Sequence, residues 1–145
     1  MTASRVPITT GKSPNEQLIV RWVDAINDRS FGRFDELFSA DYVNHNPPPG
    51  GQAAGIEGLK LFFQELCDGL DGFRYTIDEL SSEGNRVRVR LSGRGRHIGE
   101  VMGSPPTGEM AEVTVTHLYE ISGGRIVARW GDPTDPPMLR TRTGS

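Results

Sequence analysis

The chain has 145 residues, 35% of them apolar, and its 16 Lys and Arg against 19 Asp and Glu give a formal net charge of −3. This length suffices for one domain with a core and is too short for two, and the charge lacks the basic excess that a nucleic acid partner requires. No apolar run approaches the roughly 20 residues that span a bilayer. Because Cys67 has no second cysteine in the chain to pair with, we expect a reducing, cytoplasmic location and no membrane partner.

The first part of the chain carries helical patterns. Ser13-Pro14-Asn15-Glu16 has the form of a capping box with proline at the first helical position. Apolar residues at helical spacing follow in two segments: Ile19, Trp22, Val23 and Ile26, then Phe31, Phe34, Leu37 and Phe38. Residues 41–55 are rich in Pro, Gly and Asn and predict a loop. A third amphipathic helix is predicted from Ile56, Leu59, Phe62, Phe63, Leu66 and Leu70.

The period then changes from 3.6 to 2, which is typical of half-buried strands. Strands are predicted around residues 73–78, 86–91, 113–119 and 125–130. Turn residues separate two pairs of them, Glu83-Gly84-Asn85 and Ser122-Gly123-Gly124. Helices followed by antiparallel strands predict an α+β domain over residues 13–132, with the N-terminal helices packed in a curved, mainly antiparallel sheet. The open end of such a cone is a natural ligand pocket, and residues 1–12 and 133–145 are predicted as tails.

Four segments in this order resemble a known family: DYVNHNPPPG at 41–50, RHIGEVMGSPPTG at 96–108, THLY at 116–119 and GRIVARW at 124–130. Over residues 13–132 the chain is similar to the SnoaL-like polyketide cyclases of the nuclear-transport-factor-2 (NTF2-like) superfold. The resemblance implies a cone-shaped domain, a homodimer and a small aromatic polyketide substrate. Because this superfold hosts enzymes and binding proteins alike, it predicts the fold more firmly than the function.

Family members that act on aromatic polyketides close a ring by an intramolecular aldol reaction, without metal or cofactor. The resemblance implies a carboxylate base directly after the tryptophan of the last strand and a histidine on the neighbouring strand, which is His117 here. After Trp130, however, stands Gly131, and the nearest carboxylate is Asp132. One step along a regular strand moves a side chain to the opposite face, so Asp132 reaches the pocket only if Gly131 forms a bulge.

Two enzymatic accounts of this departure remain open. If the bulge forms, Asp132 and His117 are the catalytic residues of a cyclase. If the aldol base is lost, the resemblance implies the anthracycline hydroxylase branch, without bound metal or flavin, which uses molecular oxygen and NADPH through a partner reductase. We prefer hydroxylation, with ring closure as the alternative. A non-catalytic binding protein for an aromatic metabolite is the rival from another class.

Candidate substrate-binding residues are aromatic or can hydrogen-bond: Trp130, Arg129, His45, Tyr42 and Phe63. Trp130 is predicted as a pocket wall, and His45 follows Tyr42 on the predicted rim loop. Arg129 has the same parity as Gly131, so if Gly131 points inward Arg129 does too, where it can pair with a phenolate. No metal site is predicted, because the histidines at 45, 97 and 117 lack a ligand spacing. His97 is interpreted as structural.

Overall fold

The computed structural model describes residues 13–45, 55–101, 103–132 and 138–142. The helical elements are α1 (Pro14–Asn27), the 3-10 turn η3 (Phe31–Arg33), α2 (Phe34–Leu37) and α3 (Gly55–Gly69). The strands are β1 (Phe38–Asn44), β2 (Leu70–Glu83), β3 (Arg86–His97), β4 (Met110–Ser122), β5 (Arg125–Gly131) and β6 (Met138–Arg142). In the described part of the chain, no helix has the length and apolar character needed to cross a bilayer.

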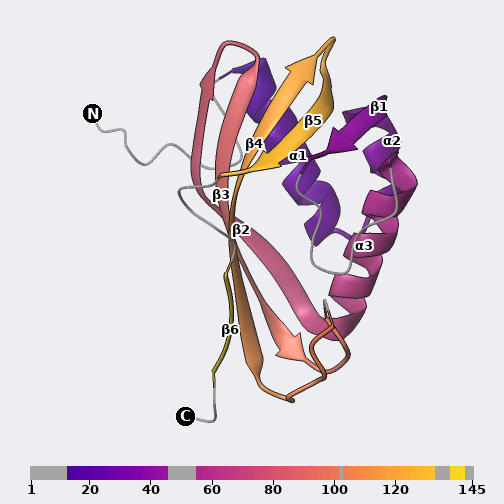
Figure 1. The fold of residues 1–145 in the computed structure, drawn as a ribbon, viewed down its shortest axis with the longest axis vertical. Coiled ribbons are helices and arrows are strands. Elements are labelled where there is room, and N and C mark those ends of the chain that lie inside the picture. The colour runs from indigo at the N-terminus through magenta and orange to yellow at the C-terminus, as the bar shows by residue number, and fades with distance from the viewer. Residues whose placement is uncertain (1–12, 46–54, 102, 133–137, 143–145) are drawn as a thin grey trace.

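The strands form one curved sheet that wraps around the helices (Figure 1). Their order is β1-β5-β4-β3-β2; β1 runs parallel to β5, and the other neighbours are antiparallel. Along one edge of β4, residues His117 to Ser122 pair with β5 and residues Met110 to Thr114 pair with β6. The predicted α+β architecture, with helices inside a mainly antiparallel sheet, is confirmed.

Helix α1 begins where the sequence predicts, because the Ser13 hydroxyl accepts a hydrogen bond from the Glu16 amide at 3.1 Å. Its C-terminal end is tied to the edge strand β2. The Asn27 side chain exchanges two hydrogen bonds with the Tyr75 backbone, at 2.8 and 3.0 Å, as a neighbouring strand would. The Arg29 guanidinium donates to the Phe73 carbonyl at 2.7 Å. These contacts satisfy part of the backbone that an edge strand leaves open.

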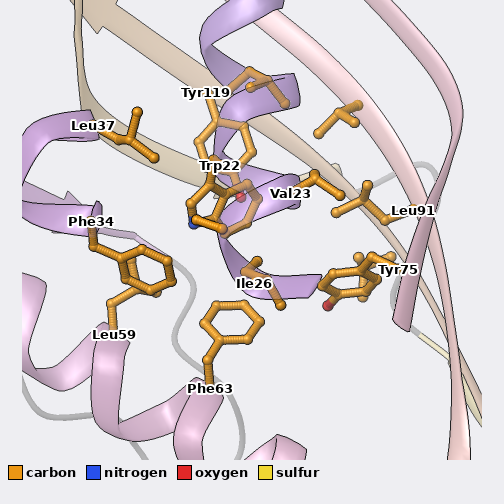
Figure 2. Packing of buried hydrophobic residues seen from close by; sticks show 14 of the residues in the cluster. Trp22, Val23, Ile26, Phe34, Leu37, Leu59, Phe63, Tyr75, Leu91 and Tyr119 are labelled. Carbon is orange, nitrogen blue, oxygen red and sulfur yellow. The ribbon is translucent and has the colours of Figure 1, made fainter. Parts of the chain in front are cut away.

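The core lies between the helices and the concave face of the sheet (Figure 2). Trp22 of α1 is at its centre, with its ring edge-on to those of Phe63, Phe38 and Tyr119 at centroid distances of 5.3 to 5.9 Å. Edge-to-face packing of this kind adds to the free energy gained by burial alone. Phe63 therefore belongs to the packed aromatic core, where it also meets Phe34 and Tyr75.

Two predicted irregular segments contain strands. Residues 41–44 were predicted as loop, but they belong to β1, which pairs with β5. Residues 138–142 were predicted as part of a tail, but their backbone pairs with β4 as β6. In both cases pairing with a distant strand outweighs a weak local pattern. The rest of the predicted rim loop, at 46–54, and the N-terminal tail lie outside the described residues.

Candidate active site inside the curved sheet

The end of β5 determines which side chains enter the interior. Tyr119 is opposite Arg129, and His117 is opposite Gly131, in an unbroken antiparallel ladder. Since odd-numbered residues of β4 are buried on the concave face, Arg129 and Gly131 also face inward. The parity argument for Arg129 is confirmed. The inward position next to Trp130 thus carries no side chain, and two residues earlier it carries a guanidinium.

Arg129 organises a polar cluster, here called the Arg129 cluster: Arg129, His117, Tyr119, Asn44 and Tyr42. The guanidinium donates to Asn44 Oδ1 at 2.7 Å and its Nη2 contacts His117 Nε2. On the other side of the imidazole, Nδ1 lies 3.2 Å from the Tyr119 hydroxyl. His117 and Tyr119 are buried, whereas Arg129 and Asn44 are partly exposed, so the accessible side of the cluster is at the guanidinium.

The cluster fixes the protonation of His117. Arginine only donates, so Nε2 of His117 must accept, and the ring hydrogen is assigned to Nδ1, next to Tyr119. Burial, reinforced by the positive charge of Arg129, lowers the pKa of His117 well below 6.5. His117 is therefore a neutral imidazole at neutral pH.

Two further polar atoms at the cluster are buried without a hydrogen-bond partner among the described residues. They are the hydroxyl of Tyr42 and the indole Nε1 of Trp22. Burial raises the pKa of Tyr42 to about 12, although Arg129 opposes the shift, so the phenol keeps its proton. Buried polar groups without partners are rare and often mark a site that a ligand completes. With Arg129, they provide donors to a negatively charged oxygen.

Asp132 lies on the opposite face of the sheet. Its amide donates to the Thr116 carbonyl at 3.1 Å, which continues the regular ladder without a bulge at Gly131. Its carboxylate accepts from Arg88 Nε, also at 3.1 Å, on the outer face. The prediction that a bulge turns Asp132 into the interior as catalytic base is therefore wrong.

Trp130 and His45 are also outside. Their rings stack at 4.6 Å with an interplanar angle of 2°, and the Arg86 guanidinium lies 5.0 Å from the Trp130 ring centroid. Since Trp130 alternates with the inward Arg129, its prediction as a pocket wall is wrong, and His45 lies beside it rather than on the interior rim. Tyr42, by contrast, points inward.

Other functional residues escaped the sequence-based reasoning. Asn44 was placed in a loop, and Trp22 was interpreted as core packing; only the alternation along β1 and the unpartnered Nε1 reveal their place at the cluster. His97 is buried at the far end of β3 with both ring nitrogens unpartnered among the described residues. In that same part of the chain, no three His, Cys, Asp or Glu side chains gather as metal ligands.

Comparison with known proteins identifies the fold and the family. The sequence pattern of the SnoaL-like polyketide cyclases matches residues 16–137, nearly the whole described domain. The chain belongs to this family. The resemblance on four short segments is thereby extended to the full domain, and the α+β cone is the fold of the family.

Two curated SnoaL-like relatives are aklanonic acid methyl ester cyclases. DauD of Streptomyces sp. (strain C5) is 32% identical over 124 aligned residues, which cover 79% of this chain and 72% of DauD. DnrD of Streptomyces peucetius is 31% identical over 119 residues, covering 75% and 77%. Among solved structures, IdmH of Streptomyces antibioticus superimposes with a TM-score of 0.71 at 27% identity, covering 88% of this chain and 92% of IdmH.

Proposed function

We propose that this SnoaL-like protein is a cyclase that closes a ring of an aromatic polyketide ester by intramolecular aldol condensation. The observation that carries the proposal is the pairing of a neutral, buried imidazole with a guanidinium on the concave face. The activity named for both curated relatives supports the same reaction class. Ring closure therefore replaces hydroxylation as the preferred function.

In the proposed reaction a substrate oxygen takes the place of His117 on the Arg129 guanidinium. His117 Nε2 is then free to remove a proton from a carbon between two carbonyl groups, which is already acidic. Arg129 and the unpartnered Tyr42 hydroxyl stabilise the enolate oxygen. The carbanion attacks a second carbonyl, and the resulting alkoxide takes the proton back from the imidazolium. The product is an isomer of the substrate, so no oxidant or cofactor is consumed.

This assignment accounts for the glycine at the position where the family resemblance implies an acid. A carboxylate there would pair with the guanidinium of Arg129 and stabilise the protonated form of His117. With Gly131 the local charge is that of Arg129, which favours the neutral base and the negative enolate. The base role thus passes from a carboxylate to His117.

The decisive experiment uses aklanonic acid methyl ester, the compound named for the relatives, under anaerobic conditions. We expect a product of unchanged mass but different chromatographic retention. His117→Gln and Arg129→Met are each expected to lower kcat by about 10²- to 10³-fold. Arg125→Met, which removes an exposed arginine from the same strand, is the matched control and keeps the parent rate.

Hydroxylation remains the second candidate, because the described interior position next to Trp130 lacks the carboxylate that the aldol mechanism commonly uses. In that case the Arg129 cluster holds a phenolate. Molecular oxygen supplies one oxygen atom to the ring and one to water, and NADPH supplies two electrons through a partner reductase. A product one oxygen heavier, formed only in air, supports this candidate. Ligand that binds and is recovered unchanged under all conditions contradicts both enzymatic functions.

A further inference from the structure

The outer face at the end of β5 carries an ion-pair chain that spans several strands. Arg88 of β3 contacts Glu79 of β2 through Nη1 and Asp132 through Nε, each at 3.1 Å. Strand β4 lies between Arg88 and Asp132, since Leu118 is opposite Arg88 and Trp130 is opposite Leu118. The Asp132 side chain is only 11% exposed, so water screens this pair less than it screens a fully exposed one.

The chain acts where β5 has the least backbone support. The last contact from β1 is the hydrogen bond from the His45 amide to the Arg129 carbonyl at 2.9 Å. Beyond it, β4 holds the strand through the rung between the Asp132 amide and Thr116. The next residue, Pro133, has no amide hydrogen to donate. The Asp132 carboxylate thus anchors the strand just after its last rungs.

Arg129 depends on those rungs. Its guanidinium meets His117 only because residues 129 and 131 stay in register with 119 and 117. A shift of one residue would move Arg129 to the outer face, and fraying of the end would lengthen its contact with the imidazole. The same residue that faces away from the interior is therefore linked to it through the strand.

We propose that Asp132 is a positioning residue whose ion pair with Arg88 holds the end of β5 so that Arg129 reaches His117. The kinetic consequence rests on the proposed function, whereas the positioning itself does not. Asp132→Asn removes the charge and keeps the shape. Glu112→Gln is the matched control, because Glu112 faces Arg94 of the same strand β3, at 3.9 Å, away from β5.

The first measurement needs no substrate. In ¹⁵N NMR spectra of histidine-labelled protein, His117 of the parent is expected as a neutral ring with the hydrogen on Nδ1. Asp132→Asn is expected to shift or broaden this signal, and Glu112→Gln to leave it in place. The exchanged pair Arg88→Asp with Asp132→Arg is expected to restore it. An unchanged His117 signal in Asp132→Asn overturns the proposal.

The second measurement is turnover. We expect Asp132→Asn to lower kcat by about 10- to 100-fold, through misplacement of a transition-state donor, with little change in KM. Charge exchange with Arg88 is expected to recover most of the rate. If the exchanged pair restores the NMR signal but not the rate, Asp132 acts as a base itself and the proposal is wrong. If the parent turns over no substrate, the proposed function fails while the NMR result still decides the positioning.

Discussion

Burial and a neighbouring cation together set the chemistry of His117. An exposed histidine titrates near pH 6.5, but this imidazole is 7% exposed and shares its Nε2 with a guanidinium that cannot lose its proton. Both effects disfavour the imidazolium. A neutral base beside a fixed positive charge is suited to generating an anion, because the charge that rises in the reaction is the one that the site already favours.

The lowered pKa of His117 predicts how stability depends on pH. In the unfolded chain the imidazole takes up a proton below about pH 6.5, whereas in the folded protein it does so only at lower pH, so the unfolded state binds more protons between the two pKa values. Stability is therefore fully present above about pH 6.5 and falls as pH drops, by up to about 1.4 kcal/mol per pH unit.

Urea titrations of the parent and of His117→Gln between pH 7.5 and 5 test this prediction. The free energy of unfolding of the variant is expected to fall less over this range, because the variant lacks the titrating ring. Equal pH dependence of the two proteins would contradict the lowered pKa. His45→Gln is the control, since His45 is exposed on the outer face.

At the scale of single elements, β5 shows what a two-residue period can and cannot predict. Parity correctly placed Arg129 and Gly131 on one face of the strand. It did not reveal whether a bulge would bring Asp132 to that face. A bulge depends on hydrogen bonds with β4, and here the Asp132 amide continues the ladder to Thr116. The same dependence on a partner strand explains why β1 and β6 were missed.

Strand β6 is expected to protect the first half of β4. A chain that ends after residue 137 leaves the backbone of Met110 to Thr114 without its β6 partner. We expect faster amide hydrogen exchange at those positions and a lower Tm, because an unpaired edge exposes its N–H groups to water. A chain that ends after Arg142 retains β6 and is the control. Unchanged exchange in β4 would show that β6 contributes nothing to this edge.

At the scale of the whole molecule, one core joins the helices to the sheet. Buried side chains of α1, α2, α3 and four neighbouring strands form one cluster among the described residues. The candidate site shares this core, since Trp22 and Tyr119 belong to both. Since a single core favours all-or-none unfolding, the site is expected to be lost together with the fold.

The two tryptophans test this cooperativity, because Trp22 is in the core and Trp130 is on the outer face. In Trp130→Phe only Trp22 reports on unfolding, and in Trp22→Phe only Trp130 does. The fluorescence transition of each variant is expected to coincide with its own far-UV circular dichroism transition. An earlier change at Trp130 would show that the end of β5 unfolds separately.

The sequence by itself determined the helix cap at Ser13, the amphipathic stripes, the two hairpin turns and the family, because these depend on neighbouring residues or on short motifs. It also brought out His117 and Arg129. Only the tertiary structure decided that Asp132, Trp130 and His45 face outward and that Asn44 and Tyr42 meet Arg129 inside. The physical reason is that strand pairing joins residues 85 positions apart, and no local pattern records which rung of one strand lies opposite which rung of another.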